Sequence, residues 1–108
     1  MGMGQKVVFP KERAPAWPAL VECLAAKKLV AELRMIDGEL AFPEESPPEN
    51  WRELRIGAAG GMITLRRELD GITLVIWGNA DEKLRAACTH VATAIADLAA
   101  GNKIPTGP

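Results

Sequence analysis

Two Asp–Gly pairs, Asp37–Gly38 and Asp70–Gly71, constrain the fold more than any other feature of this chain. Asp–Gly is a strong signal for a two-residue β-hairpin turn, because both turn residues must tolerate positive φ angles. Between residues 29 and 76, apolar residues alternate with polar ones, which is the period of a half-buried strand. Both turns bring the apolar residues of the paired strands to one face. This segment therefore predicts an antiparallel sheet with one apolar face and one charged face.

The same turns predict which residues lie opposite each other in a sheet of four to five strands. The first hairpin is expected to pair Ile36 with Glu39, and the second to pair Leu69 with Ile72. With this pairing, three further large side chains should point to the apolar side: Leu40, Phe42 and Leu69.

The turn between the two hairpins is less constrained. A two-residue loop at Gly60–Gly61 would set Glu53 against Glu68, and like charges placed directly opposite destabilise a sheet. A four-residue loop over 58–61 instead sets Glu53 against Arg66. We therefore predict the second register.

Helical patterns flank the strand segment on both sides. A first helix is predicted over 18–28, beginning at a proline, and a second over about 79–101. Asn79 and Glu82 form a capping-box pattern at the start of the second helix, and Gly101 can end it. We predict an α+β fold, a mainly antiparallel sheet with an N-terminal and a C-terminal helix packed on one face.

Proline and glycine divide the rest of the chain. Residues 1–14 are expected to form a flexible or extended arm, residues 15–101 a single domain, and residues 102–108 a flexible tail. Three prolines within Pro43–Asn50 exclude both helix and central strand there. This segment is expected to be a loop at one end of the sheet.

Charge and composition disfavour several classes of function. The chain has 13 basic and 14 acidic residues, so it has no overall field to attract nucleic acid or an anionic membrane. It contains no apolar stretch long enough to cross a bilayer, and its N-terminus lacks a signal-peptide pattern, which favours a cytoplasmic location. We expect no nucleic-acid or membrane partner.

The residues suited to metal binding or nucleophilic catalysis are few and poorly spaced. Cys23, Cys88 and His90 form no metal-ligand motif, and Cys88 falls in the apolar stripe of the second helix. We therefore expect no metal and no cofactor, and these residues favour a non-enzymatic protein over an enzyme.

Two binding surfaces remain open as hypotheses. The first is the charged sheet face, where a mixture of charged and apolar side chains would suit a protein partner or a homodimer. Its expected members are Arg34, Arg55, Arg66, Val75 and Trp77. The second is a ligand site at the sheet end, because Arg67 has the inward parity of its strand and Trp51 follows the proline-rich loop. The first hypothesis makes the chain an interaction module; the alternative makes it a small-molecule-binding protein or a small enzyme.

Overall fold

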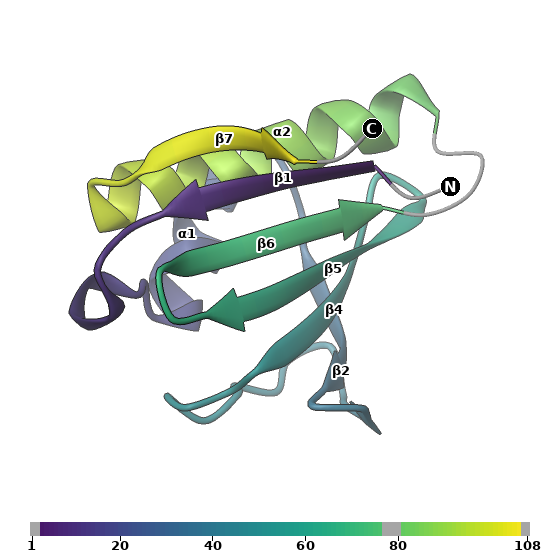
Figure 1. The fold of residues 1–108 in the computed structure, drawn as a ribbon. Coiled ribbons are helices and arrows are strands. Elements are labelled where there is room, and N and C mark those ends of the chain that lie inside the picture. Colours follow the sequence, from purple (N-terminus) through teal and green to yellow (C-terminus); the bar gives the residue numbers. More distant parts are fainter. Residues whose placement is uncertain (1–2, 77–80, 107–108) are drawn as a thin grey trace.

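The computed structural model describes residues 3–76 and 81–106. Within these ranges, seven strands form one antiparallel sheet in the order β3-β2-β4-β5-β6-β1-β7, and two α-helices accompany it (Figure 1). In chain order the elements are β1 (Met3–Val8), the 3-10 helix η1 (Lys11–Arg13), α1 (Trp17–Ala26), β2 (Glu32–Ile36), β3 (Glu39–Leu40), β4 (Glu53–Ala58), β5 (Gly61–Glu68), β6 (Gly71–Ile76), α2 (Glu82–Ala99) and β7 (Asn102–Thr106).

The α+β fold and the antiparallel sheet are confirmed, but the predicted number of strands is too small. The two missing strands are β1, from the predicted arm, and β7, from the predicted tail; they pair with each other between residues 4–8 and 102–106. The two glycines and two prolines of residues 101–108 led us to expect a tail, yet β7 is an edge strand, where the missing N–H of Pro105 is tolerated. The first and the last strand of the chain thus lie side by side (Figure 1).

The registers of the hairpins agree with the sequence in two cases and differ in one. Ile36 pairs with Glu39, as predicted. Glu53 pairs with Arg66, also as predicted, although the turn itself is the two-residue Ala59–Gly60.

The third hairpin has a different register from the predicted one. Glu68 pairs with Gly71, so the turn residues are Leu69 and Asp70. Gly71 is needed within β6, because a side chain there would overlap the carbonyl oxygen of Val7 on the neighbouring strand.

Three side chains that we expected on the apolar face are instead exposed. Leu40 is 88% exposed, Phe42 69% and Leu69 85%. Leu69 is a turn residue, and Leu40 ends the two-residue strand β3 at the sheet edge. A β-bulge between Leu33 and Met35 sets Met35 opposite Arg55. Leu40 pairs with Met35, so Leu40 lies on the charged face and not on the apolar one.

Both helices form near their predicted positions, with different caps. The side chain of Asp81, rather than Asn79, accepts a hydrogen bond from the backbone N–H of Leu84 at 2.8 Å, while Asn79 lies outside the described residues. At the other end, Ala100 takes the left-handed conformation that we expected of Gly101. Gly101 is close to β1, where an added Cβ would meet the carbonyl oxygen of Val8.

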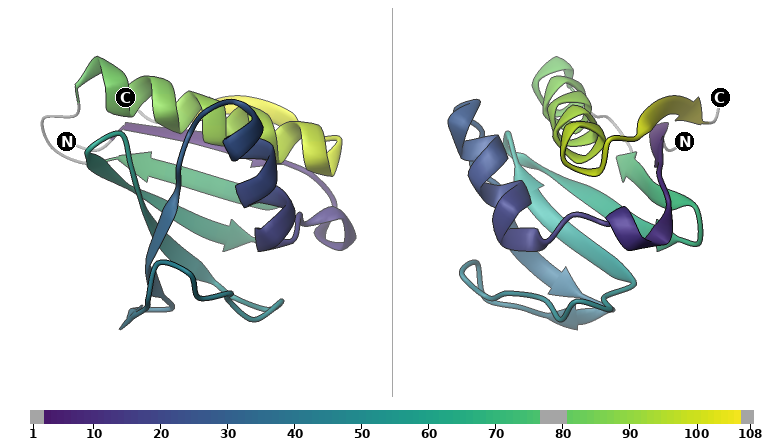
Figure 2. Two further views of the ribbon diagram at one scale, coloured as in Figure 1. Left: turned by 180° about the vertical axis from the view of Figure 1, so that it is seen from behind. Right: turned by 90° about the vertical axis from the view of Figure 1, so that its left-hand side faces the viewer.

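The core lies between the sheet and the two helices. The helix α2 contacts β1, β5, β6 and β7 as well as α1, and α1 adds the buried side chains of Trp17, Leu20 and Leu24 to the same core (Figure 2). Large side chains with no more than 1% exposure fill the space between them: Leu24, Leu33, Leu54, Ile56, Ile63, Leu65, Ile72, Leu74, Val91 and Ile95. Each buried side chain of this size stabilises the fold by roughly 1.5–3 kcal/mol. The segment before α1 and the loop 43–51 are left at one end of the sheet.

Candidate functional site

A groove of 680 Å³ lies at this end of the sheet. One wall is formed by Ala14–Pro18, the segment that leads into α1, and the other by Ser46–Trp51, the end of the proline-rich loop. Lys11 and Arg67 complete the lining. Small-molecule pockets in proteins usually have volumes of about 300–1,000 Å³. The groove therefore has the size of a binding site for a small ligand.

Asp37 fixes the loop that forms the second wall. Its Oδ1 accepts hydrogen bonds from the backbone N–H groups of Arg52 (2.7 Å) and Glu53 (2.9 Å), and its own N–H donates to the carbonyl of Glu53 at 2.8 Å. The two hydrogen bonds that the carboxylate accepts lower the pKa of the Asp37 carboxyl, and the bond from the N–H of Glu53 has the larger effect. The first hairpin is thereby tied to the start of β4, directly after Trp51.

Arg67 is held by two contacts at the base of this wall. Its guanidinium carbon lies 4.3 Å from the centre of the Trp51 ring, within cation–π range. Its Nη1 donates a hydrogen bond to the carbonyl oxygen of Glu49 at 2.5 Å. The backbone N–H of Arg67 also donates to the carbonyl of Arg52 at 2.8 Å. The structure thus brings together Trp51 and Arg67, the two residues of the predicted ligand site.

The charge of Arg67 is only partly compensated. Burial lowers the pKa of its guanidinium, and the more distant carboxylate of Asp37 opposes that shift. Its Nε is buried without a hydrogen-bond partner among the described residues. Arg34, Arg55 and Arg66, by contrast, each have a carboxylate within 4.0 Å. Arg67 is therefore a fixed cation beside a groove.

The charged sheet face is stabilised by its own ion pairs. Arg66 and Arg55 both approach Glu53, at 3.3 and 3.5 Å, and Arg34 approaches Glu32 at 3.7 Å. Exposed pairs of this kind contribute at most about 1 kcal/mol each. Val75 is half-buried, and Trp77 lies outside the described residues.

The cysteines and the histidine do not assemble into a reactive centre. Burial raises the pKa of the Cys88 thiol to about 11, which leaves it protonated at neutral pH. Cys23 is half-buried on α1, and His90 is exposed on α2. Among the described residues, no group of three His, Cys, Asp or Glu side chains could hold a metal ion.

Sequence reasoning found Arg67 and Trp51 but missed the opposite wall. Lys11, Pro15 and Trp17 line the groove, yet Lys11 falls in the segment 1–14 that we had treated as an arm. No local pattern signals their role, because it depends on how α1 sits beside the loop. The two prolines Pro15 and Pro18, which stiffen this wall, were the one available hint.

No known protein family, curated protein or solved structure matches this chain. In the part of the chain that the structure describes, no helix is both long and apolar enough to span a membrane.

Proposed function

We propose that this protein is a non-enzymatic binding module that holds a carboxylate-bearing ligand in the groove between Ala14–Pro18 and Ser46–Trp51. The observation that carries the proposal is the state of Arg67, which is stacked on Trp51 and lies within 4.0 Å of no described carboxylate. A carboxylate matches the planar fork of a guanidinium better than a single point charge does. Arg67 is the anion contact, and Lys11 adds positive charge at the rim.

The geometry favours binding because Arg67 is already held in place. A flexible surface arginine loses side-chain entropy when it binds a ligand, whereas Trp51 and the carbonyl of Glu49 already restrict this one. One of its five N–H groups is used by Glu49 and one, on Nε, is buried. The others remain for a ligand that also covers the apolar walls.

The test is isothermal titration calorimetry with small carboxylates that carry an aromatic or aliphatic group. A hydrogen bond to a charged group contributes about 1.5–3 kcal/mol, so Arg67→Gln should weaken binding by about 10- to 100-fold. Arg66→Gln is the matched control, since Arg66 is the adjacent residue but pairs with Glu53 on the other face. It should leave the affinity unchanged.

A second variant changes the charge of the groove at an exposed position, where the substitution should not disturb folding. Lys11→Gln alters a groove residue with an exposed side chain, and it should weaken binding by a few fold only, because the charge is at the rim. Equal binding by the wild-type protein and a folded Arg67→Gln variant would refute the proposal, as would the absence of binding to any carboxylate.

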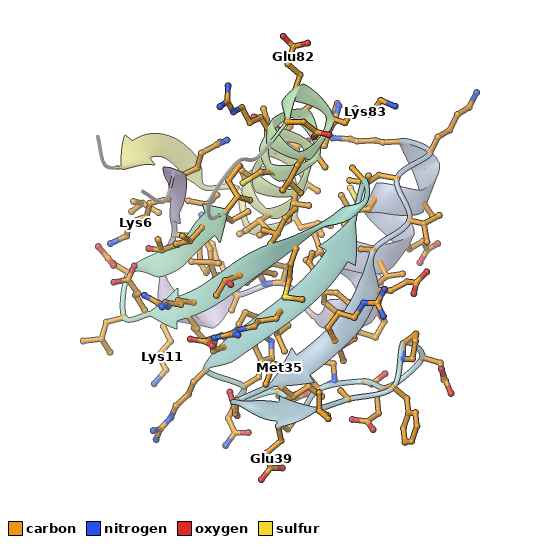
Figure 3. All side chains as sticks on the ribbon, turned by 90° about the vertical axis from the view of Figure 1, so that its right-hand side faces the viewer. Lys6, Lys11, Met35, Glu39, Glu82 and Lys83 are labelled. Carbon is orange, nitrogen blue, oxygen red and sulfur yellow. The ribbon has the colours of Figure 1, made fainter. Side chains whose placement is uncertain are left out.

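Self-association is a second candidate function, favoured by one observation. Leu40 and Phe42 are 88% and 69% exposed beside the sheet edge formed by β2 and β3. Figure 3 shows Met35 and Glu39 at this end of the molecule, far from Glu82 at the start of α2. A second copy could cover these apolar side chains. Light scattering should then show a dimer that becomes a monomer in a Leu40→Ser/Phe42→Ser variant; a wild-type monomer at high concentration would exclude it.

A further inference from the structure

A second hollow adjoins the groove and carries the opposite charge. It has a volume of 310 Å³ and lies between α1 and residues 43–46. Trp17, Pro18 and Ser46 line both hollows, so the two lie next to each other, and we call the pair the trough. The second hollow is bordered by three acidic side chains: Glu22, Glu44 and Glu45.

The trough therefore has a basic end and an acidic end. Lys11 and Arg67 lie at one end, with Glu49 as the one acidic residue there, and the three glutamates lie at the other. The first end thus has two cations and one carboxylate, and the remaining lining residues are uncharged. Such a charge distribution complements an occupant with separated negative and positive groups, and it disfavours one that carries two negative charges.

The backbone of the walls favours an occupant that carries hydrogen-bond donors. Five prolines line the trough and have no N–H group: Pro15, Pro18, Pro43, Pro47 and Pro48. Among the described residues, no N–H donates to the carbonyl oxygens of Ser46 and Pro47. These two free carbonyl oxygens can accept hydrogen bonds from the amide N–H groups of an extended peptide.

We propose that the occupant is the C-terminal segment of a peptide, with its terminal carboxylate at Arg67 and a lysine or arginine side chain, a few residues upstream, at Glu44 and Glu45. This assignment rests on the proposed function, because it uses the same Arg67 contact. It deepens that function by naming the class of ligand and the direction in which it lies.

The experiment measures fluorescence anisotropy of N-terminally labelled pentapeptides of alanine. Lysine is placed second, third or fourth from the free C-terminus, and glutamine replaces it in the control peptides. For at least one spacing, lysine should tighten binding by about three- to tenfold, as expected for exposed ion pairs with two or three glutamates. The gain should shrink as salt is raised. Amidation of the C-terminus should abolish binding by all peptides.

Protein variants then show which glutamates contact the lysine side chain of the peptide. Glu44→Gln/Glu45→Gln should remove the preference for lysine and leave binding of a small carboxylate unchanged. The matched control is Glu39→Gln/Glu82→Gln, which removes two exposed glutamates outside the trough (Figure 3); it should keep the preference.

The outcomes separate this inference from the proposed function. If lysine and glutamine peptides bind equally while small carboxylates still need Arg67, the peptide assignment is wrong and the carboxylate site stands. If the lysine preference survives in Glu44→Gln/Glu45→Gln, the assignment is also wrong. If neither carboxylates nor peptides bind, both proposals fail.

Discussion

Asp37 provides the sharpest test of how the loop beside the groove is held. It combines a positive φ of 50° with a carboxylate that accepts two backbone hydrogen bonds across the start of β4. Three substitutions separate these contributions. Asn keeps an acceptor and tolerates the positive φ, Gly keeps only the backbone freedom, and Ala keeps neither.

The magnitudes follow from these roles. Because the carboxylate is largely exposed, each of its hydrogen bonds is taken to contribute about 1 kcal/mol, at the lower end for a charged acceptor. Asp37→Asn should then lower the free energy of unfolding by about 0.5–1 kcal/mol and Asp37→Gly by about 2 kcal/mol. Asp37→Ala adds the cost of a left-handed non-glycine residue and should reach about 3 kcal/mol.

The assay is urea unfolding at pH 7 followed by circular dichroism, repeated at low pH. Because the pKa of Asp37 is lower in the folded state than its ordinary 3.8, its ionised form stabilises the fold. That stabilisation is complete above pH 3.8 and is lost as the pH falls through the lowered value. The difference between wild type and Asp37→Asn should therefore disappear in acid. Equal stabilities of the Ala and Asn variants at pH 7 would refute the reasoning.

Three further predictions concern the fold. Gly71→Ala should destabilise the protein by about 3 kcal/mol or more, since the added Cβ would overlap Val7 in β1, whereas Gly38→Ala, with no atom within 4 Å, should cost only about 1–2 kcal/mol; thermal unfolding compares them. Native protein treated with iodoacetamide at pH 8 should be alkylated at Cys23 before Cys88, because burial raises the Cys88 pKa to about 11; mass spectrometry showing the reverse order would contradict this. Leu24→Ala should cost about 2–5 kcal/mol in urea unfolding, since this side chain is fully buried at the contact between the helices, and a loss below 1 kcal/mol would place α1 elsewhere.

The sheet could be predicted from sequence where local signals agreed with one another. The turn at Asp37–Gly38 was correct because turn chemistry and alternation favoured one register, and the pairing of Glu53 with Arg66 was correct because charge pairing selected it. The turn at Leu69–Asp70 was not, because the decisive fact is the approach of β1 to Gly71. Strand β7 was missed for the same reason, since its partner β1 is about a hundred residues away in the chain.

The candidate site was predictable only in part. The inward parity of Arg67 within its strand identified it as an arginine that needs an explanation, and Trp51 was placed near it by its position after the loop. The opposite wall and the acidic hollow depend on how α1 packs beside α2, and no residue pattern encodes that arrangement locally. Sequence reasoning therefore found the cation and could not find the trough.

The most direct test of the carboxylate site is NMR of the arginine side chains during a ligand titration. Addition of a small carboxylate should shift the guanidinium signals of Arg67 and the indole signal of Trp51, while those of Arg66 stay in place. Shifts of equal size at both arginines, or none at Arg67 with saturating ligand, would contradict the account.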